Sequence, residues 1–198
     1  MNASRLALSF LMASCLTLTA VEPGQAAPDF KAKDLKGNAV ALADLKGKVV
    51  VLEWVNYGCP FVAKHYDTGN LPKLQKEAAA KGVVWITVNS AAQGKQGHHP
   101  VDEMAALAAK QGNAAAHFVM DSDGVIGRAY GAKVTPHLFI IDAAGKVAYN
   151  GAIDSLATTK KEDVATAEPW FQQALTAVLA GQPVAKASNK PYGCGVKY

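Results

Sequence analysis

An apolar run that ends close to a helix start constrains this chain more than any other feature. The run covers residues 49–55, Val-Val-Val-Leu-Glu-Trp-Val, and is typical of a buried strand. Cys59 follows it directly before Pro60, and proline is favoured at the first position of a helix. We therefore expect the Cys59 sulfur at a helix N-terminus, where N–H groups and the helix dipole favour negative charge. Cysteines in such positions form the reactive thiolate more readily, so Cys59 is a candidate redox or nucleophilic residue.

The rest of the chain alternates between helix and strand patterns. After the helix that starts at Pro60, we expect helices over 71–81, 100–112, 125–130 and 169–181, and strands over 83–89, 118–120, 138–142 and 147–149. The last two strands flank a turn pattern, Ala-Ala-Gly-Lys, and form a β-hairpin. This order predicts an α/β fold in which helices flank a central mixed sheet. Cys59 then lies at the carboxyl edge of the sheet, where the sites of open α/β sheets gather.

Length and composition fit one globular domain. The chain has 198 residues, of which 50% are hydrophobic and 18% charged, enough for one well-packed core. Its net charge of +4 rests mainly on scattered lysines, since Arg128 is the single arginine after residue 26. Nucleic-acid readers cluster lysine and arginine on one face. We therefore expect no nucleic-acid partner.

The first 26 residues have the pattern of an export signal. Arg5 precedes the mostly apolar residues 6–18, and Ala26 ends a small-residue cleavage pattern. A membrane span needs about 20 apolar residues, so we expect a cleaved signal peptide over 1–26 and no spanning helix in the mature chain. Cys15 lies in an imperfect lipoprotein box, a less favoured interpretation that would anchor the protein to a membrane. The expected location is the periplasm or the exterior of the cell.

The remaining chain divides into a domain over 27–181 and a polar, lysine-bearing tail over 182–198, which we expect to be flexible. Cys59 and Cys194 are the two cysteines of these residues. Two cysteines are too few for a disulfide scaffold, and a core of this size needs none. In an oxidising compartment these two cysteines can still form a disulfide with each other.

A proline directly before the predicted strand at 138–142 is the second informative feature. Pro136 follows Val134 and Thr135, and a proline at this place removes a hydrogen-bond donor from the sheet. A cis peptide bond before Pro136 is one explanation, because cis bonds are nearly exclusive to proline. A trans proline at the start of the strand is the commoner case and stays open.

Taken together, these segments carry a family resemblance. The chain resembles the thioredoxin-like superfamily, closest to its alkyl hydroperoxide reductase/thiol-specific antioxidant, or redoxin, branch. The matching segments are Pro28 to Phe30, Asp34 to Gly37, Leu45 to Val51, Thr135 to Asp142 and Tyr149 to Asp154. The resemblance implies a thioredoxin-like fold with antioxidant or thiol oxidoreductase activity and no cofactor. It also implies that Cys59 is the attacking cysteine and that Pro136 is a cis-proline that faces it and presents backbone to a substrate.

The chain departs from this pattern at the active cysteine. Thioredoxins carry Cys-x-x-Cys, but Val62 stands at the second cysteine position here, which excludes a local disulfide. Peroxiredoxins place a threonine and an arginine around the peroxide, and the corresponding residues here are Asn56 and Pro136. Asn56 retains a hydrogen-bond donor, and the arginine role is vacant unless Arg128 reaches the site. These departures count against efficient peroxide reduction, while a disulfide and a peroxide both stay open as the substrate of Cys59.

Cys194 is the candidate resolving thiol. A thiolate that has attacked a disulfide, peroxide or sulfenic acid needs a second thiol to release the product, and glycines flank Cys194 in the tail. The expected partners are such a substrate and a thiol reductant. A structural Cys59–Cys194 disulfide in a non-catalytic binding module stays open, as does a tail thiol without a role. Copper handling by Cys59 and His137 is a further alternative, weakened because soft Cu(I) prefers several thiolates.

Two other residues near Cys59 are of interest. Glu53 lies within the predicted strand, and a buried acid beneath the thiol assists proton transfer in thioredoxins; the pattern leaves open whether Glu53 points inward. His65 lies six residues after Cys59, which is not a spacing that places it over the thiol on a helix. We expect a surface or packing role for His65.

Overall fold

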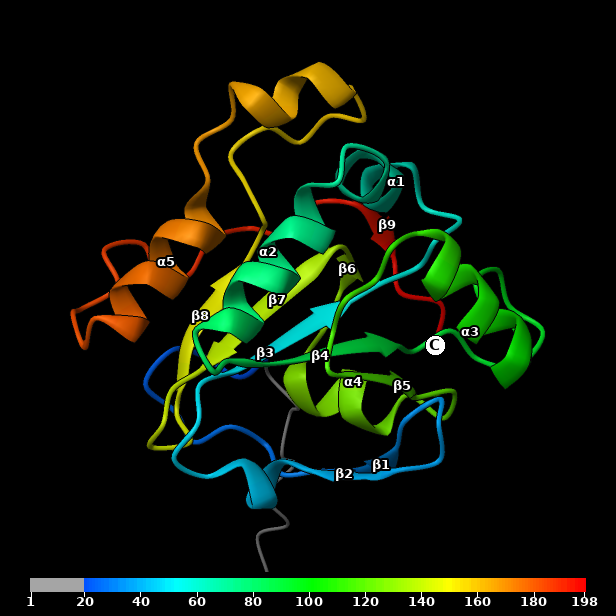
Figure 1. Cartoon of the computed structure of the whole chain (residues 1–198), viewed down its shortest axis with the longest axis horizontal. Helices are drawn as coiled ribbons and strands as arrows, with labels where there is room; N and C mark the ends of the chain where they lie inside the picture. The colour runs from blue at the N-terminus through cyan, green and yellow to red at the C-terminus, as the bar shows by residue number, and fades with distance from the viewer. Residues whose placement is uncertain (1–19) are drawn as a thin grey trace, which may run out of the picture.

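A five-stranded mixed sheet forms the centre of the protein (Figure 1). The computed structural model describes residues 20–198, so the expected signal segment lies almost entirely outside the described residues, and Cys15 with it. The strand order is β5-β4-β3-β7-β8. The strands are β3 (Val50–Trp54), β4 (Val84–Asn89), β5 (His117–Met120), β7 (His137–Ile141) and β8 (Val147–Gly151). The prediction of an α/β fold with a central mixed sheet is confirmed.

The direction of the strands follows the order of helices along the chain. Strand β3 is parallel to β4, and β4 to β5, because a helical connection joins each pair. Strands β7 and β8 form the predicted hairpin and pair antiparallel, and β7 is also antiparallel to β3. All five residues of β3 are buried, as the apolar run predicted.

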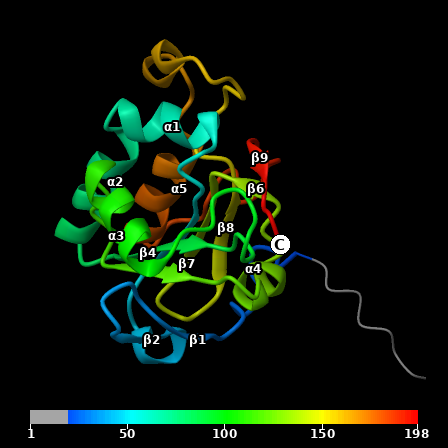
Figure 2. The same cartoon turned by 90° about the vertical axis from the view of Figure 1, so that its right-hand side faces the viewer.

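Helices cover both faces of the sheet (Figure 2). They are α1 (Pro60–Asp67), α2 (Asn70–Ala80), α3 (Val101–Lys110), α4 (Val125–Tyr130) and α5 (Trp170–Leu179). Apolar side chains of α1, α2, α3 and α5 pack with Val51, Trp85 and Tyr149 on one face. Helix α4 packs with Val50, Ile86 and Phe139 on the other. Among the described residues, no helix is long and apolar enough to cross a membrane.

The predicted elements agree with the structure to within two residues at most ends, but several short elements were not predicted. They are β1 (Lys31–Lys33), β2 (Ala39–Ala41), β6 (Val134–Thr135), β9 (Cys194–Gly195) and the 3-10 helices η1 (Leu42–Leu45) and η2 (Lys161–Ala165). Strands β6 and β9 form a separate two-stranded pair. Elements this short carry no periodic sequence signal.

The tail after residue 181 lies against the domain, which differs from the flexible tail that its polar sequence predicts. Ser188 forms a bridge with Asn150 of β8, and β9 pairs with β6. The last residue, Tyr198, donates a hydrogen bond from its hydroxyl to the Ala132 carbonyl oxygen at 2.8 Å. In Figure 1 the red tail segment therefore runs past α1 and β6. Composition alone carries no information about such long-range pairing.

Candidate active site

Cys59 lies where the sequence predicts it, at the N-terminus of α1. It is the N-cap residue, with an extended backbone, and Pro60 occupies the first helical turn. The carbonyl oxygen of Cys59 accepts a helical hydrogen bond from the Ala63 N–H at 2.9 Å. The side chain itself has 0% exposure. A solvent-borne substrate therefore cannot touch the sulfur in this arrangement of the chain.

The Thr135–Pro136 peptide bond is cis, the first of the two alternatives that the sequence leaves open. The Thr135 carbonyl oxygen accepts a hydrogen bond from Cys59 Sγ at 3.1 Å. Thr135 and Pro136 come from β6 and the link to β7, and β7 pairs with β3, the strand that leads to Cys59. The sheet thus joins two segments that lie 76 residues apart in the sequence.

Cys194 lies at the same place. In the β6–β9 pair it is in register with Thr135, and its carbonyl oxygen accepts a hydrogen bond from Thr135 Oγ1 at 3.5 Å. Burial and the neighbouring Cys59 raise the pKa of Cys194 to about 11, while Lys197 opposes this shift. Both cysteines are free thiols. Cys194 is therefore held in its protonated form beside Cys59 near neutral pH.

Asn56 supports the turn before Cys59. Its side-chain oxygen accepts the Gly58 N–H at 2.9 Å, and its amide donates to Gln96 Oε1 at 2.9 Å. Its backbone carbonyl oxygen accepts the Cys59 N–H at 2.9 Å. The amide that would be the donor to a peroxide is thus directed to the loop that holds Gln96.

Arg128 is engaged away from Cys59. Its Nη1 donates to the Asp123 carbonyl oxygen at 2.6 Å, and its guanidinium lies over the ring of Tyr198, 4.6 Å from the centroid. Arg128 is the one arginine of the described residues. The arginine position of peroxiredoxins is therefore not filled by this side chain.

His137 is buried and occupied by protein partners. Its Nδ1 accepts the Lys133 N–H at 3.4 Å, so Nε2 carries the proton and donates to Asn150 Oδ1 at 2.7 Å. Burial lowers the pKa of His137 to about 4. The part of the chain that the structure covers contains no group of three or more metal-ligating side chains. Both ring nitrogens of His137 thus have protein partners in this arrangement.

Glu53 does point inward, which the sequence left open. The carboxylate has 0% exposure and accepts hydrogen bonds from Tyr66 Oη at 2.7 Å and from Gln75 Nε2 and Trp85 Nε1 at 2.8 Å each. Burial raises its pKa, and the three donors oppose that shift. Tyr66 lies on α1, so this acid ties β3 to the helix that Cys59 caps.

Sequence reasoning missed a buried polar cluster beneath α1 that holds the tail. The Tyr192 hydroxyl donates to Asp154 Oδ1 at 2.5 Å and lies 3.2 Å from His65 Nε2. Lys64 completes the cluster, with its Nζ 3.4 Å from Asp154 Oδ2. The expected packing role of His65 is confirmed, but inside the protein rather than on its surface. The burial of Lys64 and His65 could not be predicted from the sequence, because their partners lie about 90 residues or more along the chain.

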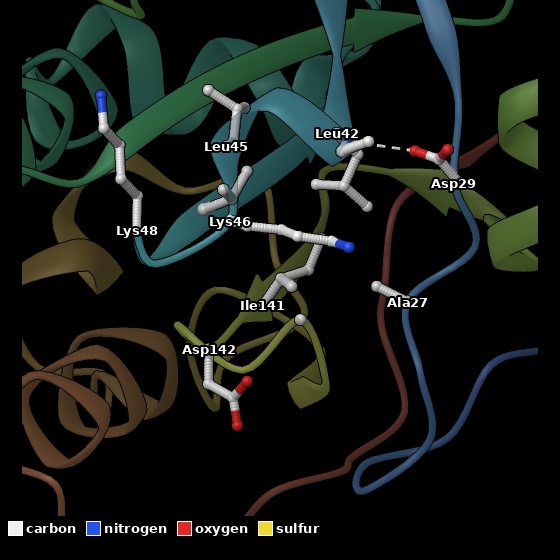
Figure 3. Close-up of a pocket in the computed structure, with 11 residues that line it drawn as sticks. Ala27, Asp29, Leu42, Leu45, Lys46, Lys48, Ile141 and Asp142 are labelled. Atoms are coloured by element: carbon white, nitrogen blue, oxygen red, sulfur yellow. Dashed lines mark hydrogen bonds between the residues drawn. The ribbon is translucent and has the colours of Figure 1, made fainter.

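A pocket of about 210 Å³ lies at the opposite end of the sheet (Figure 3). Val50, the first residue of β3, and Ile141, the last residue of β7, contribute to its lining. Cys59 follows the other end of β3. The pocket lining also includes Asp29, Lys46 and Asp142 but no cysteine or histidine. It is therefore separate from the cysteine site.

Comparison with known families agrees with this geometry. The model of the Redoxin family matches residues 22–167. The chain belongs to the Redoxin family. The match includes Cys59 and Pro136 and ends before Cys194, so the tail contact is a feature of this chain outside the matched region. No match was found among curated proteins.

Solved structures share the fold of this Redoxin-family chain. An uncharacterized conserved protein from Geobacillus kaustophilus is 26% identical, with a TM-score of 0.75 over 89% of this chain and 92% of its own. A candidate thiol:disulfide interchange protein, DsbE, from Chlorobium tepidum is 25% identical, with a TM-score of 0.59 over 81% and 99%. A secreted Mycobacterium tuberculosis disulfide oxidoreductase is 23% identical, with a TM-score of 0.52 over 75% and 95%, and shows the fold alone. The recognition of a thioredoxin-like, redoxin-type chain is confirmed.

Proposed function

We propose that this protein is a thiol–disulfide oxidoreductase in which Cys59 attacks and Cys194 resolves. The observation that carries the proposal is the register of Cys194 with Thr135, because it places a second free thiol at Cys59 in a chain that lacks Cys-x-x-Cys. The similarity to the thiol:disulfide interchange protein of Chlorobium tepidum supports the same class of reaction.

The two steps balance as thiol–disulfide exchange. The tail first moves away from β6 and exposes Cys59. Cys59 then loses its proton, and its sulfur attacks a substrate disulfide, forming a mixed disulfide and releasing the first substrate thiolate, which takes up that proton. Cys194 then loses its proton and attacks the Cys59 sulfur, which releases the second substrate thiol. The protein gains a Cys59–Cys194 disulfide, and the substrate is reduced to two thiols. A dithiol reductant restores the protein by the reverse exchange.

The environment of the two sulfurs supports this order. Cys59 caps a helix, and its sulfur lies 3.1 Å from the Thr135 carbonyl oxygen. The pKa of Cys194 is raised to about 11 by burial and by the neighbouring Cys59, so Cys194 stays protonated before the first exchange. Formation of the mixed disulfide converts the Cys59 thiol to an uncharged disulfide sulfur, which removes one cause of that shift and favours ionisation of Cys194.

A disulfide is favoured over a peroxide as the substrate. Arg128 is bound to Asp123 and Tyr198, and the Asn56 amide is bound to Gln96, so neither side chain is directed at an oxygen bound to Cys59. Export to the periplasm or the cell exterior is part of the proposal. It rests on the signal pattern over residues 1–26, and compartments outside the cytoplasm permit disulfides.

The test follows protein thiols by mass spectrometry after addition of oxidised glutathione, in protein carrying Cys15→Ser. The protein that keeps both Cys59 and Cys194 should form the internal disulfide and release two equivalents of reduced glutathione. Cys194→Ser should stop at a Cys59–glutathione mixed disulfide, and Cys59→Ser should remain unmodified. The order would be refuted if glutathione modified Cys194 in the Cys59→Ser protein as fast as it reacts with the protein that keeps both cysteines.

A further inference from the structure

An aromatic pair lies beside the two cysteines and connects their segments. Phe61 stands two residues after Cys59, and Tyr192 stands two residues before Cys194. Their ring centroids are 5.8 Å apart. Since Phe61 lies in the first turn of α1, its contact with the Tyr192 ring places the tail segment before Cys194 against the helix that Cys59 caps.

The hydroxyl of Tyr192 has a defined orientation. It donates to Asp154 Oδ1 at 2.5 Å, and His65 Nε2 lies 3.2 Å from the same phenol oxygen. His65 Nδ1 faces the amide nitrogen of Asn70 at 2.9 Å, so Nδ1 accepts and Nε2 carries the proton that it donates to Tyr192. Burial lowers the pKa of His65 to about 4, which keeps this tautomer neutral. The phenol oxygen thus both donates and accepts.

Asp154 is itself held by a buried cation. The Nζ of Lys64 lies 3.4 Å from Asp154 Oδ2, and the side chains of Lys64 and Asp154 are 0% and 6% exposed. Lys64 also donates to the Leu156 carbonyl oxygen at 2.9 Å. A buried ion pair of this kind resists rearrangement, because separation leaves an uncompensated charge. The acceptor for Tyr192 is therefore fixed to α1.

We propose that Tyr192 and Asp154 are positioning residues that hold Cys194 at Cys59 and so set the effective concentration of the resolving thiol. The inference rests on the proposed function, since it presupposes that Cys194 resolves. Both residues act through the tail backbone that carries Cys194 rather than through a hydrogen bond to either sulfur. A thiol on a free tail has an effective concentration in the millimolar range, whereas groups held in a reactive orientation exceed this greatly.

The experiment measures the equilibrium of the Cys59–Cys194 disulfide with mixtures of reduced and oxidised glutathione, in protein carrying Cys15→Ser. Tyr192→Phe removes the hydroxyl but keeps the ring against Phe61. We expect the equilibrium constant to fall about tenfold, as the loss of one hydrogen bond to a charged group implies. Tyr192→Ala, which also removes the ring, should cause a larger fall and let a Cys59–glutathione mixed disulfide accumulate.

Tyr130→Phe is the matched control. Its hydroxyl donates to the Pro28 carbonyl oxygen at 2.8 Å, and Tyr130 packs on the face of the sheet opposite to α1. This variant loses one phenol hydrogen bond without a change near the tail. The equilibrium constant of its Cys59–Cys194 disulfide with glutathione should therefore match that of the protein that keeps both Tyr130 and Tyr192. Urea unfolding of both reduced variants separates a general loss of stability from a loss of positioning.

Three results would overturn the inference. An equilibrium constant that Tyr192→Phe leaves unchanged would show that the hydroxyl does not position Cys194. An equal fall in Tyr192→Phe and Tyr130→Phe would assign the effect to stability alone. If the protein that keeps Tyr192 and Tyr130 forms no Cys59–Cys194 disulfide, the proposed function is overturned, and the positioning role with it. The first two results leave the proposed function intact, so the two failures are distinguishable.

Discussion

Gly193 passes so close to Thr135 that a side chain at position 193 would overlap with the Thr135 carbonyl oxygen. That oxygen accepts the hydrogen bond from Cys59 Sγ. Gly193 also has a positive φ of 141°, a conformation that residues with a side chain rarely adopt. The glycine before Cys194 therefore lets the tail approach the oxygen that contacts the attacking cysteine.

Gly193→Ala should lift the tail from β6 and expose Cys59. We expect the rate of Cys59 alkylation by iodoacetamide in the reduced protein to rise by about tenfold or more, because a clash with backbone costs at least about 1–3 kcal/mol. Gly195→Ala is the control on the other side of Cys194, since a Cβ there would meet only the Lys133 carbonyl oxygen, at 4.0 Å. Equal alkylation rates in the two variants would contradict the role of Gly193.

Asn56→Ala tests whether Asn56 supports the turn or acts on a peroxide. Its side chain is bound to the Gly58 N–H and to Gln96 Oε1, two exposed residues whose polar groups can turn to water when Asn56 is lost. We expect a loss of about 0.5–1.5 kcal/mol in the free energy of unfolding, and equal slowing of the reactions of Cys59 with oxidised glutathione and with hydrogen peroxide. Stopped-flow thiol measurements compare the two rates. A loss confined to the peroxide reaction would instead support a peroxidase role.

Glu53→Gln should destabilise the fold. Three donors converge on the Glu53 carboxylate, from Tyr66, Gln75 and Trp85. A glutamine offers one acceptor oxygen and turns an NH₂ group toward at least one of these donors. We expect the free energy of unfolding to fall by about 1–3 kcal/mol, measured by urea denaturation. Glu103→Gln, at an exposed side chain on α3, should change it little; a Glu53→Gln protein as stable as that control would count against the network.

Stability should fall as the pH is lowered from about 6.5 to about 4. Burial lowers the pKa of both His65 and His137 to about 4, below the ordinary value of 6.5. Between these values the unfolded chain binds protons that the folded protein excludes, so unfolding becomes more favourable as the pH falls. Each histidine contributes about 1.4 kcal/mol per pH unit within this window.

The variant His137→Gln isolates one of these contributions. Glu53, whose pKa burial raises, changes stability in the opposite sense, so the slope of the unchanged protein is a sum of several groups. Urea denaturation from pH 7 to pH 5 should show a shallower pH dependence in His137→Gln than in the unchanged protein. Identical slopes would mean that His137 is protonated in the fold.

The central strands, the main helices and the position of Cys59 could be predicted because local patterns determine them. The run 49–55 has the apolar character of a buried strand, and Pro60 marks the helix start. The place of Pro136 at a strand start left the cis and trans forms open, and the family resemblance implied the cis bond that the structure has. These features depend on residues that are neighbours in the sequence.

The path of the tail could not be predicted, because its contacts depend on distant residues. Polar composition and glycines favour a flexible segment, yet Tyr192 finds Asp154, and Cys194 finds Thr135, only in the folded chain. The same holds for Asn56, whose partner Gln96 lies 40 residues away in a loop. The sequence could suggest Cys194 as the partner of Cys59 because these are the two cysteines after residue 26. The pairing of β9 with β6, which brings Cys194 to Cys59, is seen only in the structure.

The most direct test of the mechanism is the state of the two sulfurs in native protein carrying Cys15→Ser, equilibrated with glutathione buffers. Peptide mass spectrometry under non-reducing conditions should find Cys59 linked to Cys194 in oxidising buffer, and dithiothreitol should reverse the bond without unfolding the protein. A bond that resists dithiothreitol until the chain is unfolded would identify a structural disulfide. Glutathione that persists on Cys59 while Cys194 stays free would contradict the resolving role.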